Sequence, residues 1–381
     1  MRTSARSKVD PFIVMDVMEA ARAAEAAGRS IIHMEVGQPG TAAPAGARAA
    51  LIRAMEAGPL GYTVALGLPE LRAGIAGLYR RWYGVDLDPA RVIVTSGSSA
   101  AFLLAFTALF DAGDRVGLGE PGYPSYRQIL RALSLTPVGI PAALENRLQP
   151  VPADLAPVEG LKGLIVASPG NPSGTMLDRA ALAALIDHCR SRDISFISDE
   201  IYHGIQYGAH ATSALEVTQD AYVINSFSKY FSMTGWRIGW MVVPEDHIRT
   251  VERLAQNMFI CPPHASQVAA LAALDCTDEL EANVAVYAEN RRLMLEGLPR
   301  AGFAKIAPPD GAFYIYADVS DLTRDSRAFA REILEQAGVA VTPGLDFDPH
   351  RGGQWLRFSY ARATADIVEG LDRLRAFANR R

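Results

Sequence analysis

Cysteine, long apolar runs and excess positive charge are all scarce in this chain of 381 residues. Three cysteines, Cys189, Cys261 and Cys276, are an odd number without metal-ligand spacing, which excludes a disulfide framework and favours a reducing cytoplasm. No stretch is long and apolar enough to span a bilayer, and Phe12–Met15 is too short for a signal peptide, so we expect no membrane partner. The formal net charge of -5 argues against a nucleic-acid partner, which would require a basic surface.

What the chain does contain is a regular alternation of short apolar runs with longer helical patterns. Its length predicts two or three domains, and its 49% hydrophobic content is ordinary for a globular enzyme. The alternation predicts an α/β domain whose mostly parallel sheet is covered by helices on both faces. The expected strands are Arg91–Thr95, Arg115–Leu118, Leu161–Ala167, Ile194–Ser198, Ala221–Asn225 and Ile238–Val243, and the expected helices are Ser99–Phe110, Tyr123–Leu133 and Arg179–Arg192.

Both ends of the chain predict a smaller α/β domain. Asp10 and Pro11 have the pattern of an N-cap and a first helical residue, and the alanine-rich helix that follows should stop at Gly28, before a strand at Ile31–Glu35. We expect residues 1–43 to form a helix and arm of the small domain, residues 44–280 the large domain and residues 281–381 the rest of the small domain. The elements expected after Pro263 are the helices Ala265–Leu274, Glu279–Leu298, Ser326–Gln336 and Thr364–Phe377 and the strands Ala312–Val319, Val339–Val341 and Trp355–Ser359.

Polar and small residues gather where the expected strands end, which is the ligand-binding edge of an open α/β sheet. Ser98 and Ser99 lie between a strand and a helix, where hydroxyls and a helix N-terminus can hold an anion. Asn171 lies in a loop of turn-forming residues, and Asp199 directly follows another strand, although a lone aspartate there is as readily a helix cap. His203 lies four residues after Asp199 and raises the idea of a metal site, but no third ligand has a recognisable spacing, so none is predicted.

Lys229 lies among hydroxyls, aromatic rings and small residues, with Arg237 eight positions later. A lysine amine attacks a carbonyl only when it is unprotonated, and apolar or cationic surroundings lower its pKa. Ser226, Ser228 and Arg237 could donate hydrogen bonds to a phosphate. The segment therefore predicts a Schiff-base lysine beside a phosphate.

This segment, Ser-x-Ser-Lys followed by Gly-Trp-Arg-Ile-Gly, resembles the pyridoxal-phosphate lysine motif of class I/II aminotransferases. The likeness extends from Val36-Gly37-Gln38-Pro39 to the region of Arg357. It implies fold type I, with a mostly parallel seven-stranded sheet in the large domain. It also implies that Lys229 is the catalytic residue, which holds the cofactor as a Schiff base, and that Asp199 pairs with the pyridine nitrogen.

The resemblance implies further contacts with the cofactor and the substrate. Arg357 would grip the substrate α-carboxylate with Gly37 and Asn171 beside it, and the opening helix would fold over the substrate as a lid. Tyr62 would reach the phosphate of a neighbouring subunit, which makes a homodimer obligatory for activity. The remaining implied cofactor contacts are Tyr123 as the stacking aromatic, Tyr202 and Asn171 on the ring hydroxyl, and Ser98, Ser99, Ser226, Ser228 and Arg237 in a phosphate cup.

We therefore expect an aminotransferase that uses pyridoxal 5'-phosphate to exchange an amino group between an L-amino acid and a 2-oxo acid by a ping-pong route. Phe12, Ile13 and Met15 in the lid favour a neutral or aromatic amino acid, although these residues could equally dock the helix. A C–S β-lyase would use the same cofactor, base and carboxylate clamp, so the motifs hardly separate the two. A non-catalytic amino-acid sensor would add a DNA-binding domain, and residues 1–43 show no basic helix-turn-helix pattern.

Overall fold

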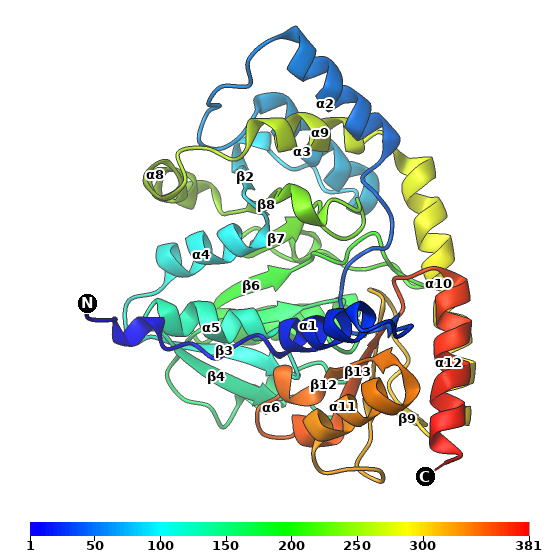
Figure 1. The fold of residues 1–381 in the computed structure, drawn as a ribbon. Coiled ribbons are helices and arrows are strands. Elements are labelled where there is room, and N and C mark those ends of the chain that lie inside the picture. Colours follow the sequence, from blue (N-terminus) through cyan, green and yellow to red (C-terminus); the bar gives the residue numbers. More distant parts are fainter. Residues whose placement is uncertain (381) are drawn as a thin grey trace.

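A seven-stranded sheet forms the centre of the computed structural model, which describes residues 1–380 (Figure 1). The strand order is β2-β8-β7-β6-β5-β3-β4, and every neighbouring pair is parallel except the two that involve β8. The predicted α/β fold with a mostly parallel seven-stranded sheet is therefore confirmed. The strands are β2 (Val92–Thr95), β3 (Arg115–Glu120), β4 (Thr136–Pro141), β5 (Leu161–Ala167), β6 (Ser195–Asp199), β7 (Tyr222–Ser226) and β8 (Gly239–Val242).

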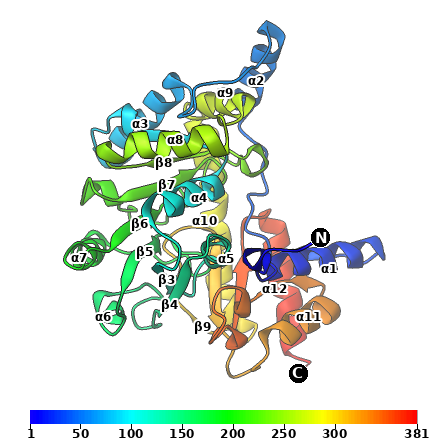
Figure 2. The same cartoon turned by 90° about the vertical axis from the view of Figure 1, so that its left-hand side faces the viewer.

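Helices cover both faces of this sheet because successive strand residues point to opposite sides (Figure 2). Ile165 packs into the core under α4, α5 and α8, whereas its neighbours Leu164 and Val166 pack into the core under α3, α7 and α9. The helices of the large region are α2 (Ala45–Ala57), α3 (Pro69–Tyr83), α4 (Ser98–Leu109), α5 (Pro124–Ala132), α6 (Pro152–Leu155), α7 (Arg179–Arg190), α8 (Ile248–Met258) and α9 (His264–Ala273).

The two ends of the chain meet in a second group of elements. The strand β1 (Ile32–His33) pairs in parallel with β11 (Val339–Ala340), and a four-stranded antiparallel sheet has the order β12-β13-β10-β9. Helix α10 (Thr277–Arg300) runs through the expected boundary at 280/281, and the domain boundaries stay a prediction. The other elements are β9 (Lys305–Ile306), β10 (Tyr314–Asp318), β12 (Thr342–Pro343), β13 (Trp355–Ser359), α11 (Ser326–Ala337) and α12 (Thr364–Ala378).

The start of the opening helix α1 (Ile13–Ala26) differs from the prediction. Asp10 is not its cap, because the Asp10 carboxylate pairs with Arg131 at 2.5 Å, and the helix begins after Phe12. The strand expected at Ile31–Glu35 is also shortened to the two residues of β1. Within residues 1–380, helices that could cross a membrane are absent.

Candidate active site

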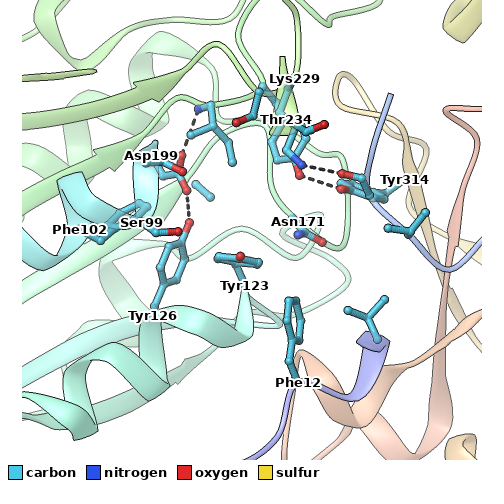
Figure 3. Close-up of a pocket in the computed structure, with 18 of the residues that line it drawn as sticks. Phe12, Ser99, Phe102, Tyr123, Tyr126, Asn171, Asp199, Lys229, Thr234 and Tyr314 are labelled. Carbon is cyan, nitrogen blue, oxygen red and sulfur yellow. Dashed lines mark hydrogen bonds between the residues drawn. The ribbon is translucent and has the colours of Figure 1, made fainter. Parts of the chain in front are cut away.

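A cavity of about 190 Å³ lies at the carboxyl ends of β5, β6 and β7, between the sheet, the N-terminus of α4 and helix α1 (Figure 3). Side chains from both ends of the chain and from the sheet line it, so residues that are far apart in sequence meet there. It brings together eleven of the predicted site residues: Gly37, Ser98, Ser99, Tyr123, Asn171, Asp199, Tyr202, Ser228, Lys229, Arg237 and Arg357.

Lys229 lies on the turn after β7 and extends into the cavity. Its Nζ donates a hydrogen bond to the Gly37 carbonyl at 2.6 Å. Burial, followed by the positive charges of Arg357 and Arg237, lowers the pKa of Lys229 to about 8, although Asp199 opposes the shift. Near neutral pH a far larger fraction of this amine is therefore unprotonated and nucleophilic than of an ordinary lysine. The position of Tyr314 requires a glycine at 37, since a Cβ there would lie 1.8 Å from the hydroxyl oxygen of Tyr314.

Asp199 ends β6 and is almost fully buried, with an exposed fraction of 2%. Its carboxylate accepts hydrogen bonds from the Ile201 N–H at 3.1 Å and from the Tyr126 hydroxyl. Burial raises the pKa of Asp199 to about 6, and the bonds from Tyr126 and Ile201 and the charge of Lys229 act against the rise. A buried carboxylate on a cavity wall, held without an ion pair in residues 1–380, fits the protonated nitrogen of a pyridine ring.

Arg357 lies on β13 with an exposed fraction of 3%, and its guanidinium packs between two aromatic rings. The guanidinium carbon, Cζ, is 4.5 Å from the ring centre of Tyr314 and 4.7 Å from that of Phe347. Nη1 donates to Asn171 Oδ1 at 2.9 Å and Nη2 donates to the Glu35 carbonyl, whereas the buried Nε has no partner. An arginine that lines a cavity with an unsatisfied N–H and no acidic partner in the described chain is suited to bind an incoming carboxylate.

Anion-binding groups gather at the start of α4. Gly97 precedes this helix with a φ of 79°, and the guanidinium of Arg237 lies so close that a Cβ on Gly97 would be 2.5 Å from Nη2. Arg237, itself left-handed with a φ of 50°, donates to the Thr234 carbonyl at 2.8 Å. Ser98 and Ser99 in the first turn add hydroxyls and a positive helix end. This set of donors fits a phosphate.

Two predicted residues do not line the cavity. Ser226 is buried behind Ser228, and its hydroxyl is used internally, with Oγ 2.7 Å from the Ser228 Oγ and 3.2 Å from the Ile238 carbonyl. Tyr62 lies on the loop between α2 and α3 with an exposed fraction of 82%, away from the cavity of its own chain. Their roles toward a phosphate stay predictions.

Aromatic and polar neighbours of the expected residues were missing from the sequence prediction. Tyr202 and Tyr314 join hydroxyls at 2.8 Å, and the ring of Tyr123 meets that of Tyr126 edge-on at 5.3 Å (Figure 3). The sequence could have predicted Tyr126, because it follows Tyr123 by three residues at the start of a helix, and residues at this spacing share one face of a helix. Tyr314 gave no such signal, because its contacts come from distant parts of the chain.

His203 is held by hydrogen bonds to two protein groups. Its Nε2 lies 2.8 Å from the Ser168 carbonyl and its Nδ1 lies 2.6 Å from the Tyr83 hydroxyl. Burial lowers the pKa of His203 to about 4, so the ring is neutral, donates from Nε2 and accepts at Nδ1. In the described part of the chain, no group of three His, Cys, Asp or Glu residues could hold a metal ion.

The mainly parallel seven-stranded sheet and the helices that cover it are those of the aminotransferase fold. The aminotransferase class I and II family model matches residues 29–374, and the chain belongs to that family. It is therefore an enzyme that transfers an amino group between an amino acid and a 2-oxo acid, and the lyase alternative is not favoured. Members of this family generally depend on pyridoxal phosphate.

Similar proteins cover the whole chain. It is 48% identical over 378 residues to a valine–pyruvate aminotransferase of Mycobacterium tuberculosis. The matched residues make up 98% of this chain and 97% of that protein. A solved aminotransferase structure from Mycobacterium tuberculosis has a TM-score of 0.98 at 46% identity, covering all of both chains. A solved structure from Silicibacter pomeroyi has a TM-score of 0.96 at 72% identity, also covering all of both chains.

Proposed function

We propose that this enzyme uses pyridoxal phosphate on Lys229 to transfer the amino group of a neutral, apolar L-amino acid to a 2-oxo acid. The observation that supports a neutral, apolar substrate is the small number of charged residues that line the cavity and the role that each of them has. In the described chain these are Asp199, Lys229, Arg237 and Arg357, and each has a use in holding the cofactor or the α-carboxylate. No cation remains among them for a second carboxylate. The similarity to a valine–pyruvate aminotransferase supports the same class.

Helix α1 and the residue before it supply the apolar part of the cavity. Phe12, Val14, Met15 and Met18 line it, and the ring of Phe12 meets the ring of Tyr123 edge-on at a centroid distance of 5.9 Å. Apolar walls stabilise an apolar substrate side chain through the area that they remove from water.

The residues present fit the cofactor. Arg237, Ser98, Ser99 and Ser228 would hold its phosphate, and Ser226 would support Ser228 from behind. Asp199 would pair with the ring nitrogen. When bound, pyridoxal phosphate supplies an aldehyde that condenses with amines and a ring that takes up electrons from the substrate Cα. The other ring contacts would come from Tyr123 against its face and from Asn171 and Tyr202 at its hydroxyl.

The protein's own groups then divide the reaction between them. Arg357 would bind the substrate α-carboxylate through the N–H groups of its planar guanidinium, which lines the cavity. Lys229 would take the proton from the substrate Cα through Nζ, and its pKa of about 8 suits a base near neutral pH. Gly37 and Asn171 fix these two side chains through the hydrogen bonds described above. The same groups act in reverse on the 2-oxo acid.

An absorbance spectrum and a panel of amino acids test this function. Wild-type protein loaded with pyridoxal phosphate should show a visible absorbance band. Leucine or valine should remove this band, and the loss should be accompanied by formation of a stoichiometric amount of a 2-oxo acid. Lys229→Ala should abolish turnover, whereas Lys162→Ala, which changes an exposed lysine on β5, should not. Near-wild-type activity of Lys229→Ala would refute the assignment, and release of ammonia with pyruvate would identify a lyase.

A further inference from the structure

The N-terminus of α1 is capped by a residue from the other end of the chain. Phe12 occupies the N-cap position and offers no side-chain hydrogen bond to the first turn. Instead, Asp346 Oδ1 accepts from the Ile13 N–H and Oδ2 accepts from the Val14 N–H, both at 3.1 Å. A carboxylate in this place satisfies two free N–H groups and also interacts favourably with the helix dipole.

The segment that carries Asp346 is also fixed to the large sheet, by contacts that do not involve α1. Its 3-10 turn packs so closely on the next one that a Cβ on Gly352 would lie 2.2 Å from the Gly344 carbonyl oxygen. Asp348 accepts from Arg351 Nε at 2.7 Å, and Arg351 Nη2 donates to the Glu120 carbonyl at the end of β3, also at 2.7 Å. Asp346 therefore ties the first turn of α1 to the large sheet, whereas Val17 and Ala21 further along α1 pack in an apolar cluster with Leu334 and Ala340.

Phe347, the next residue, contacts two other walls of the cavity. Its ring lies against the guanidinium of Arg357, and its carbonyl accepts from the Gly122 N–H at 3.0 Å, directly before Tyr123. Residues 346 and 347 thus link α1, the carboxylate-binding arginine and the aromatic wall. All three border the cavity beside the contact of Phe12 with Tyr123, where the substrate side chain is expected to lie.

We propose that Asp346 is a positioning residue that holds α1 as the apolar wall of the substrate pocket and thereby sets the affinity for large apolar amino acids. The proposal rests on the function given above, because it concerns the substrate side chain of that same site. Asp346 acts only through the helix. Loss of its two hydrogen bonds leaves the first turn of α1 unanchored, so large side chains lose contacts with Phe12, Met15 and Met18, whereas alanine, which is too short to need them, loses little.

Asp346→Asn and Asp346→Ala test this, with Asp325→Ala as the matched control for Asp346→Ala. Asp325 also caps a helix, α11, by accepting from the backbone N–H groups of Arg327 and Ala328, but α11 does not line the cavity. The KM for leucine should rise about three- to tenfold in the Asp346 variants, the range expected for loss of one helix cap. The KM for alanine and both kcat values should change by less than about twofold. Asp325→Ala, which removes the cap of α11, should leave the leucine-to-alanine ratio of KM values unchanged.

Hydrogen exchange of the α1 amides gives a readout that does not depend on activity. Exchange over residues 13–18 should be faster in Asp346→Asn than in the wild type, with the visible absorbance of the loaded protein unchanged. Equal exchange, or an unchanged leucine KM in both Asp346 variants, would overturn the proposal. A wild type that transfers no amino group would refute the proposed function instead, and the exchange comparison would still decide whether Asp346 anchors α1.

Discussion

At the scale of single residues, the cavity contains a carboxyl group whose ionised form is disfavoured by burial. Asp199 is the clearest case, because burial raises its pKa to about 6 even though two hydrogen bonds and Lys229 favour its ionised form. A carboxyl with a raised pKa in the folded state binds its proton more tightly when folded. The resulting stability is fully present below about pH 4, and it is lost as the pH rises through about 6.

Asp199→Asn should therefore stabilise the cofactor-free protein near pH 7 while it impairs catalysis. A shift of about two pKa units corresponds to at most about 3 kcal/mol, so we expect a gain of about 1–3 kcal/mol in the free energy of unfolding. The gain should vanish well below pH 4, where the wild-type carboxyl is protonated in both states. Urea unfolding at the two pH values measures this difference, and Asp187→Asn, in an exposed pair with Arg190, is the control. An equal or lower stability of Asp199→Asn near pH 7 would contradict the argument.

At the scale of elements, loops that follow different strands are tied together beneath the cavity. His203 follows β6 by four residues, and its Nε2 bonds the Ser168 carbonyl in the loop after β5, which also carries Asn171. Its Nδ1 accepts from Tyr83 at the end of α3. The neutral imidazole thus fixes the loop of Asn171 relative to Asp199.

His203→Ala should lower the free energy of unfolding by about 2–4 kcal/mol, because it leaves a buried carbonyl and a buried hydroxyl unpaired and opens a cavity. Tyr83→Phe removes only the hydroxyl bond and should cost about 1 kcal/mol. Urea denaturation of both variants, with and without zinc, measures these effects. A wild-type free energy of unfolding that depends on zinc would instead indicate that His203 binds a metal ion.

Much of this architecture is predictable because the signals are local. Central strands such as β5 are short runs of β-branched and aliphatic residues, and the polar residues at their ends mark the ligand edge. The edge strand β4 escaped prediction because Pro137, Gly139 and Pro141 interrupt its pattern, and proline is tolerated only on edges. The cap of α1 could not be found locally either, since Asp346 lies 333 residues from Ile13.

At the scale of the whole molecule, the side of the cavity that we propose holds the phosphate is open to solvent. Ser99 and Arg237 are exposed, and so is Tyr62, although all three are expected at one phosphate. The loop of Tyr62 is held by His264, whose Nδ1 lies 2.9 Å from the Gly61 carbonyl. Exposed apolar side chains, Ile52, Met55, Val64, Met258 and Ile260, occur in the neighbouring segments. These features support the proposal of a homodimer in which the partner's loop completes each cup.

Mixing two inactive variants tests this shared site. Lys229→Ala retains an intact Tyr62 loop, and Tyr62→Ala retains an intact lysine. If Tyr62 acts across the interface, a mixed dimer contains one site with both residues, so random mixing should restore about a quarter of the wild-type activity. Sedimentation should show a dimer for each variant alone, and a mixture of Lys229→Ala with Lys229→Ala/Tyr62→Ala should remain inactive. If Tyr62 acts within its own chain, or if the protein is monomeric, mixing restores nothing, because no chain then holds a complete site.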